Sequence, residues 1–222
     1  MPPKPKFTKE EITDCAFELV RSDGPDALTA REVGKRLGVS SSPIFTFFKD
    51  MDELKQSVAF RAKSRFDDYM KNAEEFYPAY KKRGLQFVKF ASEEPKLFEL
   101  LFMQNTGGDL NFKNAMSIIP FGRENDISII KRDYKATDEQ AERLFEQMWI
   151  YSYGLCVLSA QGVCKFSEEE AAKRLGEIFR GMIFVISTDA GRALNTAVIP
   201  KPTKDSVSIE MKKLGPDLSI QK

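Results

Sequence analysis

The fold of this chain is decided by residues 28–49, which carry the sequence LTAREVGKRLGVSSSPIFTFFK. Thr29 is followed three residues later by Glu32, a pattern typical of a helix start because each side chain accepts a hydrogen bond from the other residue's backbone N–H. Gly38 is placed to end this helix, since glycine adopts the positive φ that closes a helix without a steric penalty. The pattern predicts a short helix over about 30–37 that buries Val33 and Leu37.

A second short helix is expected directly after this glycine. Ser40 is the expected N-cap, and Ile44 and Phe48 are spaced to lie on the inner side. Val39 supplies an apolar residue inside the turn, and Gly34 supplies a small residue where the two helices cross. Two short helices joined in this way predict a helix-turn-helix motif.

The same start pattern recurs along the chain. It occurs as Thr8 with Glu11, Thr29 with Glu32, Asp50 with Glu53, Thr137 with Gln140, and Ser167 with Glu170. Each pair precedes apolar residues at helical spacing. Together they predict an all-α fold.

Further helices are expected on both sides of the motif. They run over about 8–23, 50–76, 78–93, 95–103, 111–119, 125–134, 138–162 and 167–187. On the helix that starts at Asp50, the expected inner residues are Leu54, Val58, Arg61, Phe66 and Met70. The last two helices are long neighbours joined by a short turn, so we expect them to pack antiparallel. We predict a head over 1–50, a helical domain over 51–190 and an extended C-terminal tail over 191–222.

Composition favours a folded binding protein over an enzyme. The 222 residues are 42% hydrophobic and 30% charged, and they include no histidine, which removes the commonest general base and metal ligand. The three cysteines show no CxxC spacing. We predict no catalytic site, no metal site and no cofactor. No apolar segment of about 18 residues appears, so a cytoplasmic location is expected.

The first sixty residues resemble the DNA-binding head of the tetracycline-repressor (TetR) family. The matching elements are Leu28-Thr29, the turn Gly38-Val39-Ser40, the aromatic run 45–48 followed by Lys49-Asp50, and Leu54. The resemblance implies a ligand-responsive transcriptional regulator, acting as a repressor. Such a protein binds a palindromic DNA operator as a homodimer through its last two long helices, and a small apolar or amphipathic effector releases it.

The geometry of a helix-turn-helix assigns candidate DNA contacts. The second helix enters the major groove with its N-terminal residues near base edges, and the start of the preceding helix faces phosphates. The candidate DNA-binding residues are Thr29, Arg31, Ser40, Ser41, Ser42, Pro43, Phe45, Thr46 and Lys49. Lys4, Lys6 and Lys9 are further candidates for charge contacts. Two departures from the family pattern, Phe45 in place of a tyrosine and Met51 in place of a lysine, imply fewer contacts to phosphates.

An aromatic and methionine-rich set in the second half is the candidate ligand site. It comprises Phe98, Phe102, Met103, Met116, Phe121, Trp149 and Tyr153. Such residues line adaptable apolar pockets, although they also form ordinary core. Two alternatives remain open: a helical small-molecule or lipid-binding protein whose head has lost DNA binding, and a helical enzyme, which the missing histidine disfavours.

Overall fold

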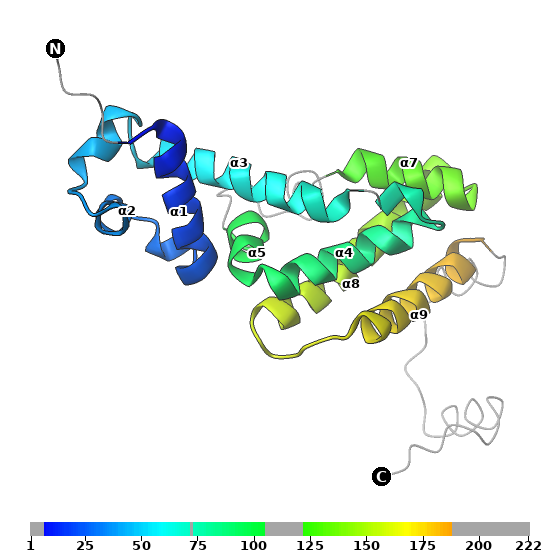
Figure 1. Ribbon diagram of the computed structural model, residues 1–222. Coiled ribbons are helices and arrows are strands. Elements are labelled where there is room, and N and C mark those ends of the chain that lie inside the picture. Colours follow the sequence, from blue (N-terminus) through cyan, green and yellow to red (C-terminus); the bar gives the residue numbers. More distant parts are fainter. Residues whose placement is uncertain (1–6, 72, 105–121, 188–222) are drawn as a thin grey trace, which may run out of the picture. The chain divides into compact units, whose positions relative to one another are not determined.

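The computed structural model describes residues 7–71, 73–104 and 122–187, and every regular element in these ranges is a helix (Figure 1). The elements are α1 (Lys9–Asp23), η1 (Pro25–Ala27), α2 (Ala30–Leu37), η2 (Ser42–Thr46), α3 (Met51–Met70), η3 (Ala73–Glu75), α4 (Ala79–Glu93), α5 (Pro95–Phe102), α7 (Arg123–Tyr134), α8 (Asp138–Ala160) and α9 (Glu168–Ser187), where η marks a 3₁₀-helix. The all-α prediction is confirmed. The helix expected over 111–119 and the tail over 191–222 lie outside the described residues.

The chain divides into two compact units, Met1–Met182 and Ile183–Lys222. The first unit contains the helix-turn-helix and all the helices from α1 to α8, together with most of α9. None of the described helices is both long and apolar enough to cross a membrane.

The N-terminal helices begin and end where local side chains allow. Thr8 and Glu11 form the expected reciprocal capping box at the start of α1, and Gly24, at φ +96°, ends this helix. Thr29 caps α2 by accepting a hydrogen bond from the Glu32 backbone N–H. Buried apolar side chains then hold α1, α2, η2 and the start of α3 together: Ile12, Ala16, Leu19, Val20, Leu28, Val33, Ile44, Phe48, Leu54 and Val58.

The turn of the motif depends on two glycines. Gly38 has the left-handed conformation at φ +69°, and the Val39 N–H then donates to the Gly34 carbonyl at 2.9 Å. A Cβ atom at Gly34 would lie 3.0 Å from the backbone carbonyl oxygens of both Val39 and Ser40. Gly34 therefore lets the turn fold back onto α2.

Three local predictions were wrong. Ser40 does not cap the second helix, because that helix is a 3₁₀-helix over Ser42–Thr46 preceded by Ser41, whose side chain makes no capping hydrogen bond. Pro43, which has no N–H to donate, lies in its first turn. Leu37 is only half-buried. Arg61 points outward and pairs with Asp14 at 2.5 Å, while Ala62 takes the buried position.

An aromatic cluster joins α3, α4 and α5. Phe66 of α3 meets Phe87 and Phe90 of α4 and Phe102 of α5 edge-on, with ring centroids 5.2 to 6.1 Å apart. Phe98 stacks on Phe102 at 5.1 Å. Edge-to-face ring pairs contribute stability beyond that of the apolar area they bury. The cluster therefore forms a packed wall along α3.

The closest neighbours of α8 are α4 and α7, and not α9 as its sequence position suggests. The other long helix, α9, contacts α4 where a Cβ at Gly84 would lie 3.5 Å from Leu175, and it contacts α7 through Tyr134 and Phe179, whose rings are 4.8 Å apart. The expectation that the two long helices pack antiparallel against each other was therefore wrong. Helical spacing identifies a buried face but not the element that covers it.

We predict that Gly34→Ala lowers the free energy of unfolding by about 1–2 kcal/mol, because the methyl group presses on the backbone of the turn. Gly84→Ala is the matched control, since its Cβ meets only a leucine methyl at 3.5 Å and an alanine favours the helix by about 0.5–1 kcal/mol. Urea unfolding of both variants measures the difference. Equal midpoints for Gly34→Ala and the wild type would contradict the role given to this glycine.

Candidate DNA-binding surface and effector cavity

The second helix of the motif presents small and aromatic side chains outward. Ile44 and Phe48 are buried against the N-terminal core, whereas Ser42 and Thr46 are exposed and the Phe45 ring is 47% exposed. The side chains of η2 therefore divide into an anchoring face and an open face. An anchored face opposite an exposed one is what the recognition helix of a helix-turn-helix requires.

The start of α2 adds a second exposed group beside it. The Thr29 hydroxyl accepts from the Glu32 N–H at 3.2 Å, which leaves its own O–H free to donate. Arg31 is exposed and forms no ion pair with any residue in the described ranges. A free guanidinium next to a helix N-terminus suits phosphate oxygens.

Neighbouring charges on this surface are largely neutralised. Lys9 pairs with Glu53 at 2.5 Å and lies over the Phe48 ring, and Lys35 pairs with Glu32 at 3.4 Å. Glu53 also accepts from the backbone N–H of Lys49 at 2.7 Å, and these two contacts, that of Lys9 first, lower its pKa. Positive charge therefore comes from few side chains here.

The nine candidate DNA-binding residues lie at the start of α2, in the turn, on η2 and in the segment before α3. Thr29, Arg31, Ser40, Ser42, Phe45, Thr46 and Lys49 are exposed, and Ser41 and Pro43 are half-buried. Lys4 and Lys6 lie outside the described residues.

A cavity of about 260 Å³ lies among α3, α4, α5, α7, α8 and α9. Most of its wall is aromatic or aliphatic. The described residues that line it are Phe66, Met70, Pro78, Tyr80, Lys81, Arg83, Gly84, Phe87, Phe102, Asp126, Tyr134, Phe145, Met148, Trp149, Ser152, Ala172, Leu175, Gly176, Phe179 and Arg180. A mainly apolar cavity with a few polar groups is the usual form of a small-molecule site.

One ion pair is buried in the cavity wall. The Arg83 guanidinium donates from Nε to the Asp126 carboxylate, and both side chains are at most 15% exposed. Burial raises the pKa of Asp126 to about 6, against the opposing effect of Arg83. At neutral pH the carboxylate is therefore largely ionised and paired.

Two of the seven candidate ligand residues, Phe102 and Trp149, line this cavity. Tyr153 instead stacks on Trp149 and donates to the Phe102 carbonyl at 3.0 Å, while Phe98 is fully buried in the aromatic cluster. Met103 is half-buried beyond the end of α5. The last two, Met116 and Phe121, lie outside the described residues. The polar members of the wall, Arg83 and Asp126 among them, gave no sequence signal because they are separated along the chain.

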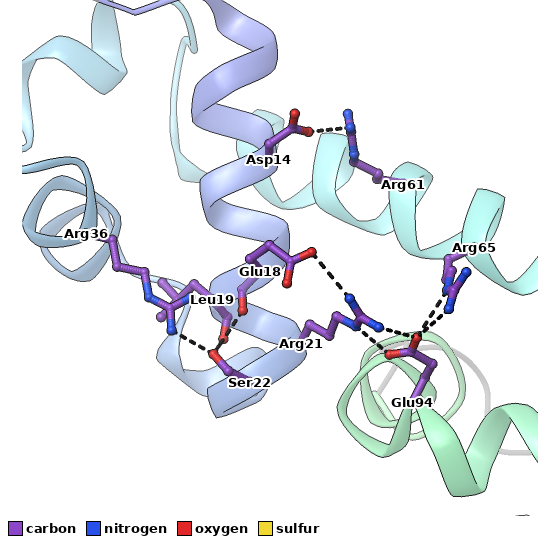
Figure 2. A network of polar contacts seen from close by, with 9 residues as sticks. All are labelled: Asp14, Glu18, Leu19, Arg21, Ser22, Arg36, Arg61, Arg65 and Glu94. Carbon is purple, nitrogen blue, oxygen red and sulfur yellow. Dashed lines mark hydrogen bonds and ion pairs between the residues drawn. The ribbon is translucent and has the colours of Figure 1, made fainter.

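A buried carboxylate connects α1 and α3 to the junction of α4 and α5 (Figure 2). Glu94 lies between α4 and α5 with its side chain 2% exposed, and it accepts from Arg21 of α1 through two hydrogen bonds of 2.7 and 2.8 Å. Arg65 of α3 donates to the same carboxylate at 3.1 Å. We call this arrangement the Glu94 clamp. One charged group thus links α1 and α3 to the junction between α4 and α5.

Helix α3 starts next to the helix-turn-helix and ends at the cavity. Asp50 caps its start beside η2, Arg65 joins the clamp, and Phe66 and Met70 line the cavity. The helix that follows the helix-turn-helix is therefore also part of the cavity wall.

A capped α-helix, a glycine turn and an exposed 3₁₀-helix together form a helix-turn-helix motif. Residues 12–58 match the family model described as "Bacterial regulatory proteins, tetR family". A crystal structure of a TetR-like transcriptional regulator from Rhodococcus sp. RHA1 matches with a TM-score of 0.59 and 15% identity, covering 80% of this chain and 97% of that chain. A comparison with curated proteins gave no match. Residues 12–58 therefore match the helix-turn-helix domain of the TetR family, and the fold of the chain is similar to that of a TetR-like transcriptional regulator.

We predict that Glu94→Gln lowers the free energy of unfolding by about 2 kcal/mol, because a charged acceptor of several hydrogen bonds is replaced by a neutral one. The adjacent Glu93→Gln is the control, since Glu93 is half exposed and accepts from Tyr69 at the surface. We expect a change below about 1 kcal/mol for the control. Urea unfolding measures both variants. Equal losses in the free energy of unfolding would show that Glu94 stabilises the fold no more than an exposed glutamate does.

Proposed function

We propose that this regulator is a homodimeric repressor that binds a palindromic operator and releases it when a small amphipathic effector enters the cavity. The observation that carries the proposal is the path of α3, which begins beside the exposed face of η2 and ends in the cavity wall. An effector shifts the operator-binding equilibrium only if it binds the two arrangements of α3 unequally. Phe66 and Met70 line the cavity, so their contacts with the effector supply that difference in affinity.

The open face of η2 supports the DNA-binding residues proposed for this chain. Ser42 and Thr46 have short side chains that bring the backbone close to base edges, while Thr29 and Arg31 face the flanking phosphates. The remaining candidates, Ser40, Ser41, Pro43, Phe45 and Lys49, complete the surface around them.

We predict that the double variant Ser42→Glu, Thr46→Glu weakens operator binding about 100-fold, since each head then carries two negative charges against DNA. Fluorescence anisotropy with DNA from upstream of the protein's own gene measures the affinity. Ser64→Glu places the same charge on the exposed side of α3 and is the control, for which we expect little change. Unchanged binding by the double variant, with an unchanged circular dichroism spectrum, would remove η2 from the DNA contact.

Exposed apolar residues on the last two long helices support dimer formation. Ile150 and Leu158 of α8 are 43% and 39% exposed, and Ile178 of α9 is 37% exposed. Gly154 and Gly181 lie between or beside them, and a Cβ at either position meets no atom of the described structure within 4 Å. Large apolar side chains beside open glycines are suited to close helix packing across a two-fold axis.

We predict that Ile150→Glu combined with Ile178→Glu converts the dimer to a monomer at micromolar concentration, because two charges per chain would be buried in the interface. Light scattering after size-exclusion chromatography measures the mass. Phe60→Glu is the control, since Phe60 is 74% exposed on α3 and lies away from the proposed interface. A wild-type protein that is monomeric under the same conditions would reject the dimer.

A further inference from the structure

We infer that the effector is an amphipathic anion, with an aromatic or aliphatic body inside the cavity and a carboxylate-type head beside Lys81, Arg83 and Arg180. This inference rests on the proposed function of the cavity as the effector site. It adds the chemical class of the ligand, which follows from how charge and hydrogen-bond donors are distributed over the wall.

Two of the cations in the wall belong to α4 and α9, which approach each other at the cavity. Tyr80 of α4 and Phe179 of α9 have ring centroids 6.3 Å apart. Lys81 and Arg180 each follow one of these rings in sequence, and both line the cavity and are exposed. Lys81 and Arg180 therefore belong to the solvent-exposed rim of the cavity.

The charge of the wall is not balanced by the protein. Its described residues include three cations, Lys81, Arg83 and Arg180, and one carboxylate, Asp126. That carboxylate already accepts from Arg83. Neither Lys81 nor Arg180 forms an ion pair with any residue in the parts of the chain that the structure describes. An anionic head group would supply the missing negative charge.

The hydrogen-bonding groups of the wall show the same excess of donors. The Tyr80 hydroxyl and the Trp149 indole N–H both belong to cavity-lining residues, and neither donates to an acceptor among the described residues. Burial raises the pKa of Tyr80 well above its ordinary value, so this hydroxyl keeps its proton. A ligand rich in acceptor oxygens satisfies these donors, whereas an ammonium ligand would add more donors to them.

The apolar part of the wall determines the size and chemical character of the ligand's body. Phe66, Phe87, Phe102, Phe145 and Trp149 surround the remaining space. A cavity of about 260 Å³ is at the small end of the usual range for ligand sites, roughly 300–1,000 Å³. The body is therefore a single ring or a short chain, and not a multi-ring compound.

Three probes with one body and different heads test the inference: 4-phenylbutanoate, 4-phenylbutan-1-ol and 4-phenylbutylamine. The full-length protein is titrated at pH 7.5, and binding is followed through the fluorescence of Trp149, the single tryptophan of the chain. We expect the acid to bind about 10-fold more tightly than the alcohol and more tightly still than the amine. An alcohol or amine that binds as tightly as the acid would overturn the inference, as would three probes without effect.

A charge-removing variant locates the head group. Lys81→Gln combined with Arg180→Gln should reduce the preference for acid over alcohol to within about twofold, with the affinity for the alcohol nearly unchanged. Lys173→Gln removes a positive charge from an exposed position of α9 that does not line the cavity, and it should keep the full preference. A preference that survives in the double variant would overturn the assignment of the head group to this rim.

Release of operator DNA, measured in parallel by anisotropy, separates this inference from the proposed function. Selective binding of the acid without DNA release supports the ligand class and contradicts the proposed control of DNA binding. DNA release by the alcohol, with no preference for the acid, supports the control of DNA binding and overturns the ligand class.

Discussion

One buried carboxylate determines how the helix-turn-helix is attached to the rest of the first compact unit. The Glu94 side chain is 2% exposed and accepts hydrogen bonds from Arg21 and Arg65. Removing a carboxylate from water costs several kcal/mol unless it is paired in good geometry, so the clamp tolerates little movement of one helix without the others. The orientation of α1 and α3 is thereby tied to the junction of α4 and α5.

The aromatic cluster extends this constraint to the cavity. Phe66 follows Arg65 directly on α3, and its ring packs on Phe87 and Phe102, which also line the cavity. A packed wall of rings moves as a unit, because interiors are too dense for one ring to shift alone. The proposed effector therefore acts on α3 through van der Waals contact at Phe66, and the clamp converts that displacement into a change at α1.

Local signals in the sequence predicted the elements well, and long-range packing limited the rest. The capping pairs at Thr8 and Thr137 and the positive φ of Gly38 depend on neighbouring residues only, so the helix ends were predictable. The partner of α8 was mispredicted because periodicity marks a buried face without naming what covers it. Glu94 and Arg83 are charged residues in sequence positions typical of an exposed surface, and only the folded chain brings their partners to them. The same holds for the cavity, whose described wall comes from six helices.

Pairing of lysines with glutamates limits the attraction between the head and DNA phosphates. Lys9 and Lys35 are paired with glutamates. Phe45 and Met51 stand where the TetR family, which the head resembles, has residues that contact phosphates. Attraction to phosphates dominates nonspecific affinity and scales with the number of neutralised phosphates. A head with few free cations therefore has weak nonspecific affinity, and a single head holds DNA poorly. In the proposed homodimer, binding then depends on two heads engaging together, which makes it sensitive to their spacing and hence to small movements of α3.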